Sequence, residues 1–274
     1  DTFKEIAYAI KNHPNEYDQY VKNAMKQGLR YPDACNQALS LLLNKSIQTP
    51  NDLLGLGYVK EVIENDYPIT LHCIKRSNDY HDTTLTKIAS ATALRKALKE
   101  KQDVHDYLLD MSYYDSLYHQ NDFFDYLKYQ IIIQSPTQLK KIHLVDEGIE
   151  NLLKKVIFDT NSYEELVNSL TSKRYTKTRI QRMLLHILMN NTKDEIKNCF
   201  PIDYILVLKM NQKGQKYLKT IKKTCSYHII TNLSSYKHPA LDLEIKSSKL
   251  LSLIDHQMIK KEFQNIPVIE LSKR

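Results

Sequence analysis

Glycine is scarce in this chain, and its scarcity limits the folds and sites that the sequence can build. The 274 residues contain five glycines, at positions 28, 55, 57, 148 and 214, whereas about 7% glycine is usual. Neither a G-x-G-x-x-G dinucleotide fingerprint nor a G-x-x-x-x-G-K-[ST] phosphate loop can be assembled from them. Because 42% of the residues are hydrophobic, the chain can still bury a core, and we predict a globular protein.

The length favours two domains, and the character of the sequence changes near residue 102. Residues 1–102 are predicted to form several helices and a single strand, at 69–74 (ITLHCI). A lone strand cannot satisfy its own backbone hydrogen bonds, and short buried strands between helices are typical of parallel sheets. Since the sequence begins with Asp1 rather than Met, we expect the other strands of an α/β sheet to come from residues upstream.

Residues 103–274 are predicted to be mostly helical. Apolar residues recur with helical spacing in seven segments, which are 107–135, 137–144, 148–158, 162–170, 177–190, 213–224 and 240–254. Two short runs, 204–210 and 228–231, have the composition of strands. The predicted fold class is therefore mainly α with α/β elements, in two domains at 1–102 and 103–274.

The net charge of +7 is distributed unevenly. Residues 166–241 hold fourteen Lys and Arg residues against three Asp and Glu, a charge of +11, which leaves −4 for the remainder. Cations recur there at helical spacing, and the candidates for binding are Lys173, Arg174, Arg179, Arg182, Lys216, Lys219 and Lys223. The pattern favours RNA or DNA as a partner over two solvated helix faces. A membrane surface is disfavoured because these helices lack an exposed bulky apolar face.

A second candidate site lies at a predicted helix start. Ser90, Thr92 and Arg95 would combine free backbone N–H groups, hydroxyls and a guanidinium, a combination that suits phosphate. Arg76 follows the predicted strand, at the edge where open α/β sheets bind ligands, and Asn51 offers an amide for a base or a ribose. Plainer interpretations stay open, because Ser90 and Asn51 are also suitable helix N-caps and Arg95 is an ordinary surface residue.

Other chemistries have little support. The four cysteines form no C-x-x-C pair and the ten histidines no H-x-x-x-H pair, so neither a metal site nor a prosthetic group is predicted. The G-x-S-x-G nucleophile motif does not occur. Because a signal peptide and a run of about 18 apolar residues are both lacking, we expect a reduced, cytoplasmic protein with no membrane partner.

Several segments together resemble one family. They are 50–55 (PNDLLG), 74–76 (IKR) with 80–82 (YHD), 88–95 (IASATALR), 147–151 (EGIEN), 173–182 (KRYTKTRIQR) and 234–242 (SSYKHPALD). In this order and spacing, between about residues 20 and 265, the sequence resembles the bacterial tRNA(Met) cytidine acetate ligases, members of the HIGH-type nucleotidyltransferase superfamily.

The resemblance implies a fold and an activity. The fold would be the C-terminal part of a Rossmann-like nucleotidyltransferase domain, followed by a mostly helical, tRNA-binding C-terminal domain. Such enzymes activate acetate with ATP, which we expect to carry Mg²⁺, to acetyl-adenylate. They then transfer the acetyl group to N4 of the wobble cytidine of elongator tRNA(Met), without acetyl-CoA. Asn51 and Arg76 match family positions that contact ATP, and Ser90, Thr92 and Arg95 match the second phosphate motif of the superfamily.

The sequence also departs from the family. Residues 1–274 contain no H-x-G-H, the motif of the family's phosphate-holding loop, so we expect an N-terminally truncated chain with no catalytic residue of its own and no adenylation activity. Asp52 stands where Asn is commoner, and Leu94 where Ile is commoner. Two alternatives stay open, a non-catalytic RNA-binding module and a plain helical scaffold.

Overall fold

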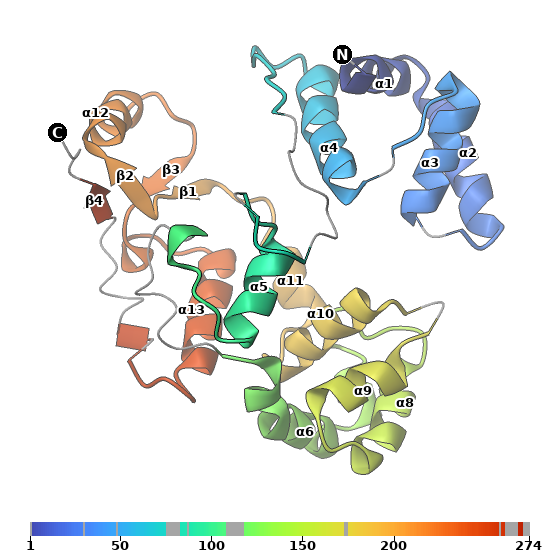
Figure 1. Ribbon diagram of the computed structural model, residues 1–274, viewed down its shortest axis with the longest axis vertical. Helices are drawn as coiled ribbons and strands as arrows, with labels where there is room; N and C mark the ends of the chain where they lie inside the picture. The colour runs from blue at the N-terminus through green and yellow to red at the C-terminus, as the bar shows by residue number, and fades with distance from the viewer. Residues whose placement is uncertain are drawn as a thin grey trace. The chain divides into compact units, whose positions relative to one another are not determined.

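The computed structural model describes residues 2–29, 31–47, 49–74, 83–86, 88–107, 118–172, 175–257, 259–260 and 268–270. The chain divides into two compact units, residues 1–115 and 116–274, and Figure 1 colours it from blue to red along its length. The boundary at residue 102 and the roles of the two domains stay predictions. None of the helices in the described part of the chain is long and apolar enough to span a lipid bilayer.

Four helices at the start of the chain share one core. They are α1 (Thr2–Asn12), α2 (Pro14–Lys26), α3 (Tyr31–Leu43) and α4 (Pro50–Glu64), with α2 packed on α3 and α1 on α4 (Figure 1). Helical spacing turns Ile6, Ala7 and Ile10 to the interior, where they are at most 4% exposed. Lys11 at the end of α1 lies 2.7 Å from a carboxylate oxygen of Asp66, which ties α1 to the residues that follow α4.

Two of the scarce glycines have a clear structural reason. A Cβ added at Gly55 would lie 3.0 Å from the ring of Phe3, so α4 approaches α1 more closely there than a side chain would comfortably allow. Gly148 has a φ of +85° as the N-cap of a helix in the second unit, a left-handed conformation that other residues adopt only with strain.

The predicted strand at 69–74 is wrong. The structure assigns no strand there, and Ile69 and Ile74 are 57% and 93% exposed. The composition of a segment indicates strand propensity but does not supply a partner, and no described segment pairs with this one. The helix predicted to begin at Ser90 is confirmed as α5 (Ala91–Lys99), and one turn of 3-10 helix, η1 (His105–Tyr107), follows it.

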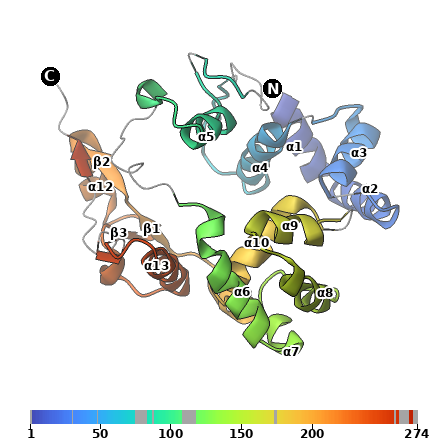
Figure 2. The ribbon, with the colours of Figure 1, turned by 60° about the horizontal axis from the view of Figure 1, so that its bottom comes forward.

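The second unit is built on a helical core. It consists of α6 (Phe124–Ile133), α8 (Ile149–Val156), α9 (Tyr163–Leu170) and α10 (Lys177–Leu188), which Figure 2 shows gathered together. The last three confirm the predicted helices at 148–158, 162–170 and 177–190. On α10 the buried side chains are Ile180, Met183, Leu184 and Ile187, which form one stripe of the helix surface.

Two other predicted helices are shorter than expected. Of the helix predicted over 107–135, residues 108–117 lie outside the described residues. In the rest a 3-10 turn, η2 (Gln120–Phe123), leads into α6, and residues 118–119 are not helical. The helix predicted at 137–144 is only α7 (Pro136–Leu139). The chain after α7 pairs instead with the residues that follow α10, where the His143 N–H donates to the Asn191 carbonyl at 2.9 Å. Backbone groups used in that contact cannot continue a helix.

A small α/β element follows the helical core. The strand predicted at 204–210 is divided into β1 (Tyr204–Leu206) and β2 (Lys209–Asn211), which pair in parallel with β3 (His228–Ile230) and β4 (Val268–Glu270), respectively. Figures 1 and 2 show α12 (Gln212–Ile221) beside β2. Two further helices, α11 (Lys193–Asn198) and α13 (Pro239–Leu251), pack on each other. A 3-10 turn, η4 (Leu233–Ser235), lies between β3 and α13.

Candidate functional site

The N-terminus of α5 carries the first candidate site. Ser90 is its N-cap, because the Ser90 hydroxyl oxygen accepts a hydrogen bond from the Ala93 N–H at 3.0 Å, and Ser90 is only 3% exposed. The plainer interpretation of Ser90 is therefore confirmed, and its oxygen serves the helix itself. The N–H groups of Ala91 and Thr92 bind no residue in the described part of the chain, so two donors of this helix start remain for an anion.

Thr92 and Arg95 lie on the exposed face of α5. They are three residues apart and therefore neighbours on the helix surface, while Ala93 and Ala97, 1% and 2% exposed, point to the packed face. Arg95 has neither a hydrogen bond nor an ion pair with any described residue. A hydroxyl, two open N–H groups and an unpaired guanidinium within one and a half turns can bind a phosphate group.

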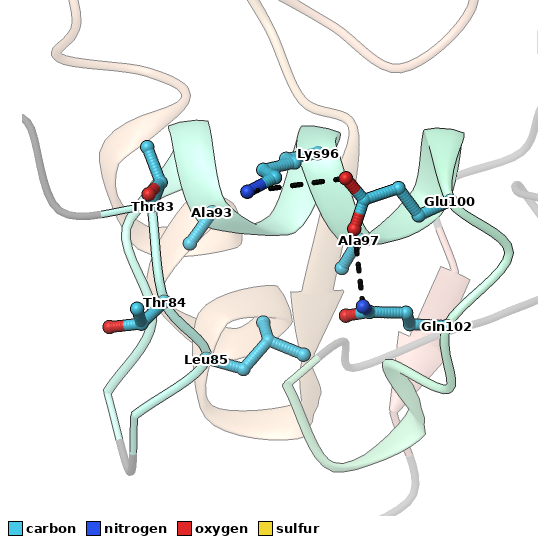
Figure 3. Close-up of a pocket in the computed structure, with 8 residues that line it drawn as sticks. All are labelled: Thr83, Thr84, Leu85, Ala93, Lys96, Ala97, Glu100 and Gln102. Atoms are coloured by element: carbon cyan, nitrogen blue, oxygen red, sulfur yellow. Dashed lines mark hydrogen bonds and ion pairs between the residues drawn. The ribbon is translucent and has the colours of Figure 1, made fainter.

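A cavity of about 250 Å³ lies against the alanine face of α5 (Figure 3). Figure 3 shows two interactions among three of the polar groups around it: the Lys96 amine lies 4.0 Å from the Glu100 carboxylate, which accepts a hydrogen bond from Gln102 at 3.1 Å. The volume is below the roughly 300 Å³ at which small-molecule pockets begin. Because Thr92 and Arg95 do not line it, this cavity belongs to the packing of α5 and does not enlarge the candidate phosphate site.

Asn51 is not the N-cap of its helix. Thr49 caps α4, because its hydroxyl oxygen accepts from the Asp52 N–H at 3.2 Å, and the hydroxyl donates to an Asp52 carboxylate oxygen at 2.8 Å. Asn51 follows within the first turn and is exposed, so its amide is not used for capping. No hydrogen bond joins it to Ser90, Thr92 or Arg95 among the described residues.

Three predicted site residues lie outside the described residues. They are Arg76, Lys173 and Arg174, and their roles stay predictions. The rest of the predicted cationic set is described and belongs to α10 and to the segment from α12 to the turn after it.

Arg179 on α10 is held against an aromatic ring. Its guanidinium carbon lies 4.5 Å from the centroid of the Tyr175 ring, a cation–π contact. Tyr175 is 7% exposed, and its hydroxyl donates to the Asp146 carbonyl at 2.8 Å, with Glu147 close by. Burial and the nearby Glu147 raise the pKa of Tyr175. The phenol is therefore neutral, and its ring is a fixed support for the Arg179 guanidinium.

Arg182 is exposed one turn further on, but His186 does not extend the cationic face. Burial, and then the neighbouring His143 and Arg182, lower the pKa of His186 to about 4. The rings of His143 and His186 meet edge to face at 4.7 Å, and burial also lowers the pKa of His143. Both imidazoles are neutral near pH 7, and the positive charge of α10 therefore resides on its arginines and Lys177.

The lysines of α12 differ from this arrangement. Lys216 and Lys219 are exposed on the helix, whereas Lys223 lies in the turn after it, because α12 ends at Ile221 rather than at the predicted residue 224. The side chain of Asn211 caps the helix by accepting from the Gly214 N–H at 2.8 Å. No residue of α12 is buried, so the lysines project from a helix that covers no core of its own.

The cations of the second unit fall into two groups. Lys193 lies 2.7 Å from Asp146 and Lys177 lies 3.9 Å from Glu164, so both have acidic partners. A second group forms no ion pair with any residue that the structure describes: Arg179, Arg182, Lys213, Lys216, Lys219, Lys222, Lys223 and Lys237. A set of unpaired cations on one unit is the arrangement that a polyanion binds.

A larger cavity, of about 640 Å³, lies beside Arg182 in the second unit. Its lining is mostly apolar and includes Phe123, Tyr163, Leu185 and Leu250, which come from four different elements. No sequence pattern indicates this cavity, because its residues are brought together only by the packing of the helices.

The chain matches a protein-family model and curated proteins over nearly its whole length. The family model is that of the HIGH Nucleotidyl Transferase, which matches residues 1–265. A tRNA(Met) cytidine acetate ligase of Geobacillus sp. (strain WCH70) is 35% identical, over 98% of this chain and 73% of its own. One of Bacillus subtilis (strain 168) is 34% identical, over 95% of this chain and 68% of its own.

Solved structures confirm the predicted fold class. The crystal structure of Thermotoga maritima TmcAL in its apo form I has a TM-score of 0.79 at 24% identity, and the match covers 98% of this chain and 74% of that one. The same protein bound with alpha-thio ATP has a TM-score of 0.77 at 23% identity, covering 97% and 73%. The mainly α arrangement with α/β elements is thus that of a nucleotidyltransferase-type fold.

Proposed function

Because the chain belongs to the HIGH nucleotidyl transferase family and, within it, to the tRNA(Met) cytidine acetate ligases, we propose that it serves the ATP-dependent acetylation of the wobble cytidine of elongator tRNA(Met). The observation that carries this proposal is the 35% identity to such a ligase over 98% of the chain. A tRNA substrate supports a cytoplasmic location, which is part of this proposal.

The reaction has two steps. In the first, a carboxylate oxygen of acetate attacks the α-phosphorus of ATP, the bond from that phosphorus to its bridging oxygen breaks, and pyrophosphate leaves. In the second, N4 of the cytidine attacks the acetyl carbonyl carbon of acetyl-adenylate. AMP then leaves with the electron pair of the broken C–O bond, and the amine loses a proton. Both steps build negative charge on phosphate oxygens, which cations and N–H donors stabilise.

We assign the ATP side to the first unit. The N-terminus of α5, with Thr92 and Arg95 exposed and Ser90 holding its first turn, binds phosphate oxygens, while Asn51 and Arg76 contact the nucleotide. The open donors at the start of α5 and the binding of alpha-thio ATP by TmcAL support this assignment. Oxygens of the triphosphate provide ligands for Mg²⁺, and the described residues contain no group of three candidate metal ligands.

The tRNA side is assigned to the second unit. The cations there that pair with no described residue include Arg179 and Arg182 on α10 and Lys216, Lys219 and Lys223 in and after α12, to which we add Lys173 and Arg174 from the sequence. Contacts between such cations and phosphates supply most of the affinity for a nucleic acid and make it depend on salt.

Labelled acetate tests the proposal directly. The full-length protein is incubated with ATP, labelled acetate and elongator tRNA(Met), and the wobble cytidine is then analysed for label. Label on N4 is the expected result, and acetyl-adenylate without labelled tRNA would contradict the transfer step. Arg95→Ala should weaken ATP use, while Arg179→Glu with Arg182→Glu should weaken tRNA binding and leave acetyl-adenylate formation intact.

One observation favours a second function. Residues 1–274 contain no H-x-G-H, so the second candidate is an RNA-binding module that does not form acetyl-adenylate by itself. Salt-dependent binding of tRNA that is insensitive to Arg76→Ala, without release of pyrophosphate from ATP and acetate, would favour this function over the ligase.

A further inference from the structure

Four aromatic rings meet where β1 and β3 begin, and neither candidate site uses them. Tyr204 is the first residue of β1 and His228 the first of β3, and the two are paired in register, so their side chains leave the same face of the strands. The rings of His228 and Tyr236 have centroids 4.5 Å apart and are tilted by 31°. The ring centroid of Tyr204 lies 6.1 Å from that of Tyr236 and 5.1 Å from that of His238.

Hydrogen bonds and a small core fix this cluster. The Tyr236 hydroxyl donates to a carboxylate oxygen of Asp203 at 2.8 Å. The Asn232 side chain accepts from the Ser234 N–H at 2.9 Å, which shapes the turn that leads to Tyr236. Beneath this turn Leu233 is 6% exposed and packs in one cluster with Tyr204 and Tyr236. The rings are therefore positioned before any ligand arrives, which lowers the cost of binding.

Packing does not account for His228. Tyr204 and Tyr236 are half-buried and cover the small core, but His228 is exposed and stacks on the outer side of this cluster. An exposed imidazole that packs on a phenol ring at a tilt of 31° presents a flat aromatic surface to solvent. Flat rings of this kind are the surfaces on which unpaired nucleobases stack in RNA-binding proteins.

Lysines lie close to both rings in the sequence. The connection from α12 to β3 carries Lys222 and Lys223 and ends at His228, while Lys237 directly follows Tyr236. None of the three lysines forms an ion pair with a described residue. The acidic group beside the rings, Asp203, is held by the Tyr236 hydroxyl and lies 3.7 Å from His238. Phosphates that flank a stacked base would therefore meet positive charge.

We propose that His228 and Tyr236 form a stacking platform for an unpaired base of the tRNA. The platform rests on the proposed function, since it takes tRNA as the ligand, but it is a binding element separate from the chemistry of acetate activation. The base lies on the exposed side of the His228 ring, Tyr236 supports that ring from behind, and Lys222, Lys223 and Lys237 bind neighbouring phosphates.

Equilibrium binding of labelled elongator tRNA(Met) across a series of salt concentrations tests the platform. His228→Ala should weaken binding by about 5- to 100-fold, the range found for loss of one stacked base, while His228→Phe keeps a ring and should stay close to the unaltered chain. Stacking releases no counterion, so the slope of log K against log salt should not change in His228→Ala. Lys223→Ala, in contrast, should lower that slope by about 0.7–0.9.

Two controls make the outcome decisive. Tyr129→Ala removes a tyrosine that is 59% exposed on α6 and lies outside the platform, and it should have no effect. Binding to a fully paired RNA duplex should be insensitive to His228→Ala.

Three results would each overturn the platform. They are an unchanged tRNA affinity in His228→Ala, an equal loss of affinity in His228→Phe, and the same loss of affinity for duplex RNA in His228→Ala. A chain that does not bind tRNA even at low salt would overturn it too. If the variants behave as expected but no label reaches the cytidine, the platform stands and the ligase assignment fails.

Discussion

Two helices of the second unit carry cations at similar spacing but are supported in opposite ways. On α10, Ile180, Met183, Leu184 and Ile187 are buried, and Arg179 rests on the ring of Tyr175. No residue of α12 is buried, and its lysines make no ion pair with any described residue. The same spacing of cations therefore occurs on α10, which buried side chains fix in place, and on α12, which has no buried residue.

The difference separates two contributions to RNA binding. A guanidinium stacked on a buried ring is oriented before binding, so α10 can recognise a phosphate at a defined position. A lysine on an exposed helix is a hydrated point charge, so α12 adds attraction over a distance and a strong dependence on salt. The predictions that follow test whether this division holds.

The largest difference is expected in stability. Leu184→Ala on α10 removes a fully buried side chain and should lower the free energy of unfolding of its unit by about 2–5 kcal/mol. Leu218→Ala on α12 removes a half-buried side chain and should cost about 1 kcal/mol. Urea unfolding of both variants measures the two losses. Equal losses would show that α12 is supported as firmly as α10.

A pH-dependent loss of stability is expected for α10 alone, since α12 contains no histidine. The pKa of His186 is lowered to about 4 in the folded chain, against about 6.5 when unfolded. Between these values the unfolded chain binds a proton that the folded chain does not, so the free energy of unfolding falls as the pH falls through this window. At about 1.4 kcal/mol per pH unit, this group contributes at most about 3.5 kcal/mol.

Replacement of the imidazole tests this dependence. Urea unfolding at pH 7 and pH 5 should show a smaller difference for His186→Gln than for the unaltered chain, because Gln does not titrate. His143→Gln makes the same exchange at the neighbouring ring, and it separates the contribution of that ring from the contribution of His186. An unaltered pH dependence in His186→Gln would show that other groups cause the acid sensitivity.

Arg-to-Lys exchange should distinguish the two helices in tRNA binding. Arg179→Lys keeps the charge but loses the planar stacking on Tyr175, and we expect about 3- to 10-fold weaker binding from a cation–π contact and its orientation. Lys219→Arg on α12 exchanges one exposed cation for another and should change affinity by less than about twofold. Fluorescence anisotropy at fixed salt measures both. Normal tRNA binding by Arg179→Lys would show that α10 contributes positive charge without any benefit from the stacked guanidinium.

Helical periodicity predicted both cationic helices, and local sequence explains why. Their apolar residues recur at the spacing of a helix face, and each helix has a polar N-cap, Thr176 or Asn211. The missing support of α12 was not predictable, since burial depends on which segments pack together. For the same reason the pattern at 69–74 indicated a strand although no described segment pairs with it.

At the candidate phosphate site, the sequence indicated which residue types suit an anion, but it did not indicate which residue is the N-cap of α4. The hydroxyls and guanidinium of Ser90, Thr92 and Arg95 were recognisable because helix starts bind anions. Thr49 and Asn51 are both good N-caps two residues apart, and only the backbone path shows that Thr49 has this role. The platform of His228 and Tyr236 left no sequence signal, because its rings come from separate strands and turns.

The smallest effect should come from the N-caps, and it should take a different form in each helix. Thr176→Ala and Asn211→Ala each remove one cap, worth about 1 kcal/mol. Packing holds α10 in place, so Thr176→Ala should lower the free energy of unfolding without exposing the helix amides. In α12 no buried side chain opposes fraying, so Asn211→Ala should speed hydrogen exchange across 212–221 and weaken tRNA binding by about two- to fivefold. Hydrogen-exchange mass spectrometry of both variants measures this, and similar protection of the two helices would mean that α12 is held by contacts comparable to those of α10.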